Sequence, residues 1–369
     1  MLQKEAWKAL ADKEPIIRPK NHTLRAVAET AGVSLATVSR VISGKARVST
    51  DVHARVCEAA TKLGVDLDAR KRANVVAFLL SNKDTLHPFH SRVLVGAADC
   101  LALHHYHLLF STLAYREDVP WKELHLPGIL QRRDLVGGVI LAGNNSPNLL
   151  QALSRRNVPF AVLGNNVLAE WRPEEYDVVS CNDRQGAYEI TRYLQALGHR
   201  DIWFVGNFRL PYFVRCFQGY RRAMEESGLQ SRQRSIDSKD DQEVGYVATK
   251  SIFSGAERVT AIFAGTDAVA QGVYKAIVDS GLQIPDDVSV VSCNDTQSAM
   301  LIPPLTSVRE FPEQVGKQLA ETVLRRIAQR DMPPQQYIIP TELIERASCR
   351  AIRPRGIAEE RRQTELVRD

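Results

Sequence analysis

Residues 23–42 read TLRAVAETAGVSLATVSRVI, and this stretch decides the fold of the N-terminal part of the chain. Val27 and Ala28 belong to an apolar pattern with helical spacing, which Gly32 interrupts with a residue that suits a sharp turn. Ser34 then stands where a helix N-cap is expected, and a second apolar stripe follows it. Two short helices about a tight turn predict a helix-turn-helix, whose second helix enters the DNA major groove.

The exposed side chains of the second predicted helix carry the DNA-binding argument, because any helical hairpin could share the apolar pattern. They are Ser34, Thr37, Ser39 and Arg40. Such side chains reach phosphates and base edges, and no acidic residue lies among them. Residues 1–75 hold 14 Lys and Arg against 8 Asp and Glu, whereas the rest of the chain is close to neutral. This charge distribution indicates a DNA-binding head on a neutral body.

Length and composition indicate a soluble protein of several domains. The chain has 369 residues, of which 44% are hydrophobic and 25% charged. No apolar run approaches the roughly 18 residues that span a membrane, and the N-terminus lacks the apolar core of a signal peptide, so we expect a cytoplasmic protein without membrane association. The six cysteines include no Cys-x-x-Cys pair, which favours reduced, buried thiols and argues against a zinc site or other metal centre.

The chain divides into five predicted parts. They are a basic arm (1–22), the helix-turn-helix domain (23–64), a charged hinge linker (65–74), an α/β core (75–352) and a polar tail (353–369). The arm either contacts DNA or is an inert extension. A third helix of the head is expected from Thr50 to Leu63, with Gly64 ending it.

The core alternates β-rich runs with amphipathic helices, which predicts parallel sheets covered by helices. Strands are expected at 75–80, 107–112, 138–142, 160–163, 178–181, 202–206, 260–265, 288–294, 337–340 and 343–344. Helices are expected at 89–105, 121–131, 147–156, 184–197, 212–227, 241–253, 267–281 and 311–329. Two such series predict two lobes, the first formed by about 75–181 and 297–329, the second by 182–296 and 330–352. A ligand cleft is expected between them, beyond the carboxyl ends of the strands.

With these motifs the chain resembles the lactose/galactose-repressor (LacI/GalR) family of bacterial transcription regulators, from about Thr23 to Arg350. The shared motifs include the helix-turn-helix stretch, HPF at 87–89, DLVGGVI at 134–140, LGHR at 197–200, TAIFAGTD at 260–267, IPDDVSVV at 284–291 and PPLTSV at 303–308. The resemblance implies an all-α DNA-binding head, a hinge, and a two-lobed core similar to periplasmic sugar-binding proteins. It also implies a sugar-like effector between the lobes, no cofactor, and a homodimer on pseudo-palindromic operator DNA.

The resemblance carries over a set of DNA contacts to the head. Leu35 and Ala36 face the bases and offer apolar contact to thymine methyl groups, whereas Arg40 is able to make a bidentate contact to guanine. A phosphate contact is the alternative for Arg40. Thr23, Ser34 and Thr37 are expected at phosphates, Ser39 at either, and Arg47 at a base or the backbone.

The hinge departs from the family pattern, in which a leucine wedges into the minor groove. Asn74 occupies the leucine position here, and a polar side chain unstacks bases less well. Arg70 and Arg72 instead suggest phosphate or minor-groove contact, with a solvated linker as the alternative.

Six effector-binding residues follow from the same resemblance. They are Phe89, His90, Asn165, Arg215, Thr266 and Asn294. Phe89 could instead pack in the core. Asn294 and Asn165 stand where relatives carry aspartates, and Arg215 lies one position from the effector-binding arginine of relatives. We therefore expect a ligand set with fewer acidic contacts.

The sequence favours a transcription repressor controlled by a small molecule. A sugar-binding protein with a vestigial DNA head is the alternative, and the basic head argues against it. An enzyme is a third hypothesis, which the absence of nucleophile-elbow, phosphate-loop and metal-ligand motifs disfavours.

Arg40→Ala is expected to abolish specific operator binding while most non-specific DNA affinity remains. The reason is that a bidentate arginine–guanine contact contributes about 1–3 kcal/mol of discrimination, whereas phosphate contacts contribute none. Footprinting of both proteins measures the effect, and an unchanged footprint would contradict the base contact.

Overall fold

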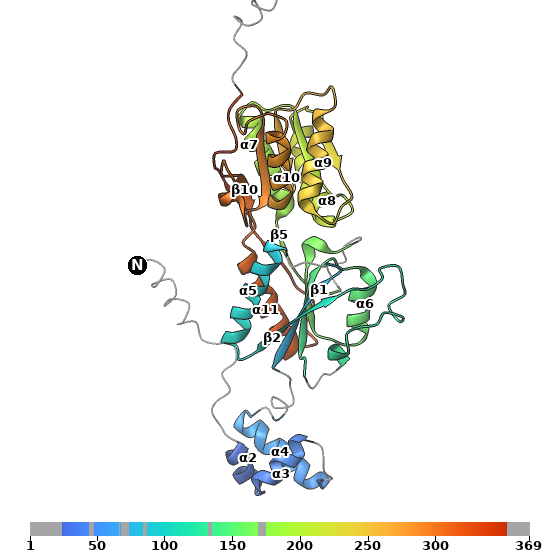
Figure 1. The fold of residues 1–369 in the computed structure, drawn as a ribbon. Helices are drawn as coiled ribbons and strands as arrows, with labels where there is room; N and C mark the ends of the chain where they lie inside the picture. The colour runs from blue at the N-terminus through green and yellow to red at the C-terminus, as the bar shows by residue number, and fades with distance from the viewer. Residues whose placement is uncertain are drawn as a thin grey trace, which may run out of the picture. The chain divides into compact units, whose positions relative to one another are not determined.

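The computed structural model describes residues 24–43, 48–65, 67, 74–83, 87–131, 135–168 and 175–352. The N-terminal unit holds three helices, α2 (Leu24–Ala31), α3 (Leu35–Ser43) and α4 (Thr50–Leu63) (Figure 1). Small apolar side chains form their common core, namely Val27, Ala28, Ala31, Val38, Val41, Val56, Ala59 and Ala60. The predicted helix-turn-helix and third helix are therefore confirmed.

The turn between α2 and α3 is held by a contact that the sequence pattern did not predict. Gly32 has a φ of 63°, the left-handed conformation expected of a glycine turn. The guanidinium of Arg55, on α4, donates hydrogen bonds to the carbonyl oxygens of Ala31 (2.6 Å) and Gly32 (3.2 Å). The third helix thereby satisfies carbonyl groups that the end of α2 leaves open.

The first lobe of the core is built on a six-stranded sheet with the order β11-β5-β4-β3-β1-β2. Its strands are β1 (Val75–Ser81), β2 (His107–Leu113), β3 (Gly138–Gly143), β4 (Phe160–Leu163), β5 (Asp177–Cys181) and β11 (Gln336–Ile339). Helices α5 (Pro88–Leu103) and α11 (Pro312–Ala328) lie on one side of this sheet and α6 (Pro147–Arg155) on the other (Figure 1). The turns η1 (Gly128–Gln131) and η2 (Gly164–Asn166) complete the lobe.

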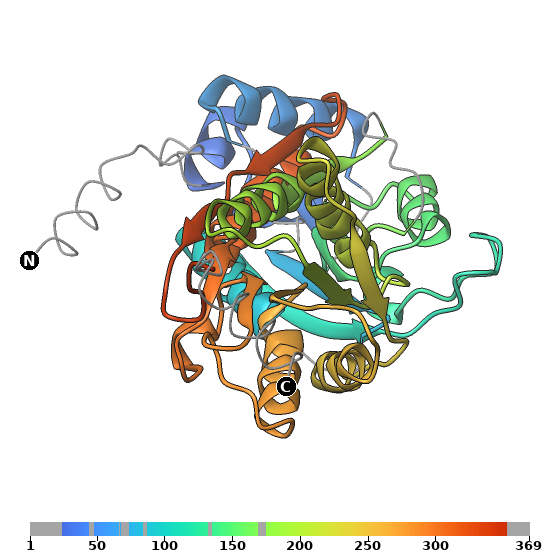
Figure 2. The same cartoon turned by 90° about the horizontal axis from the view of Figure 1, so that it is seen from above.

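The second lobe repeats this plan with the strand order β12-β10-β9-β8-β6-β7. Its strands are β6 (Ile202–Gly206), β7 (Arg232–Ser235), β8 (Ala261–Ala264), β9 (Ser289–Asn294), β10 (Thr306–Arg309) and β12 (Glu342–Ile344). The helices are α7 (Asp183–Ala196), α8 (Pro211–Glu226), α9 (Asp241–Phe253) and α10 (Asp267–Val278), with the short η3 (Ser298–Met300). Helices α7 and α8 pack together, as do α9 and α10, and the pairs cover the sheet (Figures 1 and 2). The predicted fold class, a helical head with a two-lobed α/β core, is confirmed.

The chain crosses between the lobes three times, and the crossings correct the predicted lobe boundaries. They lie between β5 and α7, between β10 and α11, and between β11 and β12. Strand β10 pairs with β9 in the second sheet, although residues 297–329 were assigned to the first lobe. Strand β11 pairs with β5 in the first sheet, although residues 330–352 were assigned to the second. Hydrophobic periodicity identifies a strand but does not say which sheet it joins.

One further expectation is wrong, the helix predicted over residues 121–131. The structure has turns there, and only the 3-10 turn η1 forms at its end. Pro127 and Gly128 follow one another in this segment and do not support a continuous helix. The cysteines agree with their prediction, since all six are free thiols and four of them are buried.

Candidate functional sites

Helix α3 presents the predicted DNA-reading face to solvent. Ser34 begins the helix as its cap, with its hydroxyl accepting the backbone N–H of Thr37 at 3.1 Å. Val38 is buried in the head, whereas Ala36, Ser39 and Arg40 are exposed. Leu35 is 51% exposed, so its side chain is available on this face of the helix.

The remaining DNA-facing predictions fall partly outside the structure. Thr23, Arg47, Arg70 and Arg72 lie outside the described residues. Asn74 is exposed, and its carbonyl oxygen accepts the backbone N–H of His107 at 2.7 Å. Its side chain therefore stays available at the start of β1.

The second candidate site is a cavity between the two lobes of the core. It encloses about 480 Å³ of space not filled by atoms, part of it open to solvent. Its lining comprises Lys83, His87, Phe89, His90, Asn165, Asn166, Leu210, Tyr212, Phe213, Asp241, Thr266, Asn294 and Glu310. This size and mixture of apolar and polar side chains are typical of small-molecule sites.

A hydrogen-bonded group of three buried residues lines one part of the cavity. The Tyr212 hydroxyl donates to Glu310 Oε1 at 3.0 Å, and Asn294 Nδ2 donates to Glu310 Oε2 at 2.9 Å. The Oδ1 atom of Asn294 has no partner among the described residues. Burial raises the pKa of Glu310 to about 8, and the charge of Asp183 adds to the rise. At neutral pH Glu310 is therefore mainly a neutral carboxylic acid.

A basic group lines the part of the cavity that belongs to the first lobe. Burial lowers the pKa of Lys83, and the charge of Asp241 opposes this effect. Burial also lowers the pKa of His87 to about 4, with a further contribution from Lys83. The pKa of His90 lies well below its ordinary value for the same two reasons, and both of its ring nitrogens lack partners among the described residues. Neutral imidazoles here offer both donors and acceptors.

Five of the six predicted effector residues line the cavity, and Arg215 does not. Arg215 forms a bidentate ion pair with the buried Asp183, with an Nη2–Oδ1 distance of 2.8 Å. Asn165 lines the cavity, but its amide already donates to Asp183 Oδ2 at 2.7 Å and accepts from the Cys181 N–H at 2.9 Å. Phe89, 7% exposed, lines the cavity and packs edge-on against His90, so its contact with an effector stays a prediction.

Two further predicted residues are held by the secondary-structure elements that they adjoin. Thr266 caps α10, accepting from the Val269 N–H at 3.2 Å, and donates to Asp241. Asn294 ends β9 with a φ of 92°, a conformation that few side chains tolerate. These constraints fix where both side chains meet the cavity.

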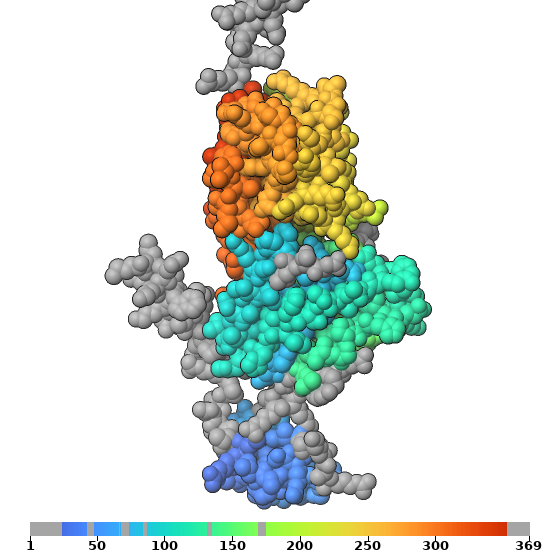
Figure 3. Space-filling model, in the orientation of Figure 1, coloured from blue at the N-terminus to red at the C-terminus, as the bar shows by residue number. Residues whose placement is uncertain are grey.

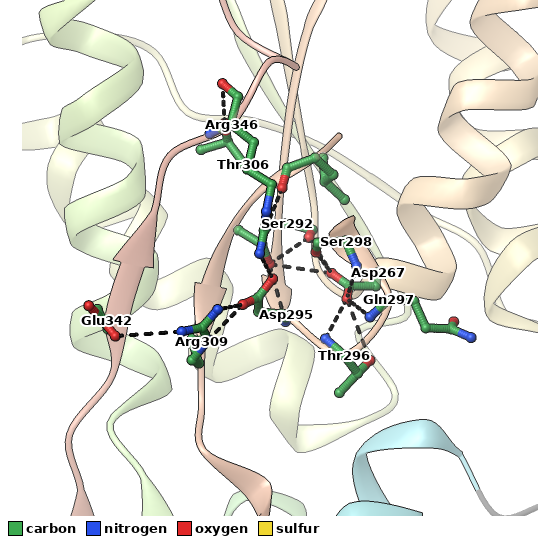
Figure 4. A network of polar contacts seen from close by, with 12 residues as sticks. Asp267, Ser292, Asp295, Thr296, Gln297, Ser298, Thr306, Arg309, Glu342 and Arg346 are labelled. Atoms are coloured by element: carbon green, nitrogen blue, oxygen red, sulfur yellow. Dashed lines mark hydrogen bonds and ion pairs between the residues drawn. The ribbon is translucent and has the colours of Figure 1, made fainter. Parts of the chain in front are cut away.

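Asp267, the first residue of α10, holds the loop that follows β9 (Figure 4). Its Oδ2 accepts backbone N–H groups of Thr296 (2.7 Å), Gln297 (2.8 Å) and Ser298 (3.2 Å), and its Oδ1 accepts the Ser292 hydroxyl at 2.6 Å. The loop after β9 is thus wrapped around one buried carboxylate. Asp295 faces away from it and pairs with Arg309 and Arg346.

The sequence analysis missed six polar residues of the lining. They are Lys83, His87, Asn166, Tyr212, Asp241 and Glu310. All of them follow the carboxyl ends of strands, as do the predicted residues, because these ends meet at one edge of each sheet. A search of every segment that follows a strand would have found them.

Two absences concern the described part of the chain. No group of three or more His, Cys, Asp or Glu side chains is arranged there to hold a metal ion. Among the same residues, no helix has both the length and the apolar character needed to cross a bilayer.

Comparison with known proteins gives a consistent result. A model of the bacterial regulatory proteins of the lacI family matches residues 23–65, and a periplasmic binding protein-like domain matches residues 191–349. Catabolite control protein A of Priestia megaterium is 30% identical over 310 residues, covering 80% of this chain and 90% of the relative. The HTH-type transcriptional repressor PurR of Glaesserella parasuis is 27% identical over 345 residues, covering 89% and 98%. The solved complex of the transcriptional regulator CelR with cellobiose has a TM-score of 0.66 at 27% identity, covering 89% of this chain and 100% of that chain.

A helix-turn-helix head on a two-lobed core with a small-molecule cavity defines a DNA-binding transcription regulator under ligand control. The chain belongs to the lacI family of bacterial regulatory proteins. The resemblance found in the sequence is thereby confirmed.

Asp267→Ala is expected to lower the free energy of unfolding by about 4 kcal/mol or more, since several buried donors lose a charged acceptor at once. Chemical denaturation measures the change. Asp331→Ala, at an exposed residue of the turn after α11, is the control and should leave the midpoint unchanged. Equal midpoints for the two variants would show that Asp267 does not hold the loop.

Glu310→Gln is expected to remove a contribution to stability that falls as pH rises. The raised pKa means that between about pH 5 and 8 the folded state keeps a proton that the unfolded chain has released. The lowered pKa values of His87, His90 and His199 contribute in the opposite direction below about pH 6.5, and this contribution is common to the wild type and the variant. Melting temperatures from pH 5 to 8.5 test this, with the exposed Glu257→Gln as control. A variant that keeps the wild-type slope would contradict a buried, protonated Glu310.

Proposed function

We propose that this protein represses transcription by binding pseudo-palindromic operator DNA as a homodimer, and that a small sugar-like effector in the cavity between the lobes controls this binding. The observation that carries the proposal is the cavity itself, where His90 and Asn294 Oδ1 are buried without partners. Buried polar atoms without partners are costly, and a bound ligand would satisfy them.

Lobe closure supplies the control mechanism. His87 Nε2 lies 4.0 Å from Asp241 Oδ2, and Arg92 Nη2 donates to the Thr296 carbonyl at 2.9 Å, so both contacts join the lobes. On the face shown in Figure 3 the surfaces of the lobes meet. A ligand that touches both lobes favours this closed state, and a ligand shifts the population only through such differential contacts.

Exposed apolar side chains support the homodimer. In the first lobe they include Val95 (53% exposed), Leu103 (77%) and Phe110 (40%), on α5 and β2. In the second lobe Met300 and Ile302 are 85% and 91% exposed. Clustered apolar side chains at a surface mark protein interfaces. Two heads on one dimer give the two-fold symmetry that a pseudo-palindromic operator requires.

We also propose that the protein acts in the cytoplasm, where its operator lies, and that it acts by binding and not by catalysis. This part of the proposal is supported by its relatives, which are transcription regulators. A ligand-binding protein with a vestigial head is the second candidate. The capped α3, with Arg40 and Leu35 exposed, argues against a decayed DNA-binding surface.

A gel shift on the DNA upstream of the protein's own gene separates these two candidates. The repressor should bind this DNA in preference to a scrambled duplex, with an affinity that falls steeply as salt rises. Arg221→Ala, an exposed arginine of α8, is the matched control for Arg40→Ala and should keep wild-type affinity. Equal binding to both duplexes would support the vestigial head.

Asn294→Ala is expected to raise the concentration of effector needed for a half-maximal change in operator binding by about tenfold or more, the value of one buried hydrogen bond to a ligand. The effector is first found by thermal-shift screening of sugars and sugar derivatives against the wild-type protein. Gln233→Ala, exposed on β7, is the control. An unchanged response in the Asn294 variant would place the effector elsewhere.

A further inference from the structure

The basic part of the cavity lining has more positive than negative groups, and this imbalance identifies the chemistry of its ligand. Lys83, His87 and His90 meet there, and Asp241 is the one carboxylate of the described lining that faces them. No hydrogen bond from Lys83 Nζ is found within the described residues. Lys83 is half-buried, and partial burial already disfavours its ammonium form, so a ligand of opposite charge would stabilise it.

The two histidines offer unused hydrogen-bonding atoms to the same ligand. The Phe89 N–H donates to His87 Nδ1 at 3.3 Å, so this nitrogen is an acceptor and Nε2 carries the proton. That Nε2 atom and both ring nitrogens of His90, which is 3% exposed, have no hydrogen-bond partner among the described residues. These atoms are able to donate to an acceptor that reaches the cavity.

The helix that carries the histidines adds to the positive potential. Phe89 and His90 lie in the first turn of α5, a helix of 16 residues. The N-terminus of such a helix carries a partial positive charge and favours anions. Three features, the half-buried lysine, the unpartnered imidazoles and the helix end, therefore favour the same sign of ligand charge.

We propose that the effector is a sugar-like molecule with an acidic group, a carboxylate or a phosphate, which binds between Lys83, His87 and His90 while its hydroxyl groups bind Asn294 and Glu310. This inference rests on the proposed function. A neutral sugar would leave Asp241 as the one carboxylate that faces Lys83, His87 and His90, and an amine would be repelled by Lys83. Asp241 acts on both Lys83 and His87, so the acidic group binds on the side of His90.

Acid binding is linked to proton uptake. An anion beside the imidazoles raises their pKa, typically by about one to three units for a close opposite charge. His87, with a pKa of about 4 in the free cavity, then takes up a proton in mildly acidic solution. The groups that face the two histidines are Lys83 and Asp241, and Glu310 adds a negative charge to the lining only above about pH 8. Affinity for the acid therefore rises as pH falls.

The first experiment uses sulfate, whose charge is constant between pH 6 and 8. Melting temperatures are compared in sulfate and in chloride at equal ionic strength, for the wild type, Lys83→Met and the exposed control Lys275→Met. The general stabilising effect of sulfate is common to all three proteins. We expect an additional rise in the wild type and the control, larger at pH 6 than at pH 8, that Lys83→Met loses. Equal rises in all three proteins would overturn the anion site.

The second experiment uses matched acids and neutral sugars in calorimetry and in gel shifts. The pairs are glucuronate with glucose, galacturonate with galactose, and glucose 6-phosphate with glucose, which also separates carboxylate from phosphate. We expect acids to bind at least about tenfold more tightly than their partners, to take up protons on binding, and to lose at least about tenfold in affinity in Lys83→Met. His90→Gln should reduce the proton uptake.

The outcomes separate this inference from the proposed function. If a neutral sugar binds in the cavity and changes operator binding whereas its acid does not, the acidic effector is wrong and the repressor stands. If sulfate and an acid bind through Lys83 but no ligand changes operator binding, the anion site stands and ligand control is wrong.

Discussion

A buried carboxylate must receive hydrogen bonds from the protein, and the shape of the cavity depends on how Asp267 meets this requirement. Its two oxygens collect backbone N–H groups and hydroxyl groups from the loop after β9, at the N-terminus of α10. The loop has little freedom left once these bonds form. Asn294 is consequently held at its positive φ, where its amide faces the ligand space. The specificity of the site thus begins with a residue that does not line it.

The titratable residues that line the cavity respond to burial in a different way from Asp267. His90 and Glu310 are buried much as Asp267 is, and Lys83 is half-buried. Among the described residues the ring of His90 has no hydrogen-bond partner, and the carboxyl group of Glu310 receives two donors. Each of them instead shifts toward its neutral form, which is the response of a titratable group to a dry environment. The imidazoles of His87 and His90, which are neutral when the cavity is empty, change their protonation when a charged ligand enters. At these positions the side chains that favour ligand binding therefore lower the stability of the core when no ligand is bound.

The sequence predicted the fold more completely than the site. The helix-turn-helix followed from Gly32, Ser34 and the apolar spacing, because those requirements are local. The lobe boundaries did not, because strands β10 and β11 carry no mark of the sheet that each joins. Arg215 was predicted at the cavity from its position in the chain, whereas its pairing with Asp183 depends on a tertiary contact. Lys83 and Glu310 acquire their character from burial, which a motif does not reveal.

The three crossings between the lobes also bear on how the chain folds during synthesis. The second sheet is nearly complete once residue 309 has been made, since it then lacks only the three-residue edge strand β12. The first sheet, although it starts earlier in the chain, still lacks β11 and α11, whose Val315, Leu319, Val323 and Ile327 are buried beside β3, β4 and β5. Its apolar face stays uncovered until the ribosome has released these last elements. The lobe encoded first is therefore the one completed last, and the one that most needs protection from aggregation while the protein is being made.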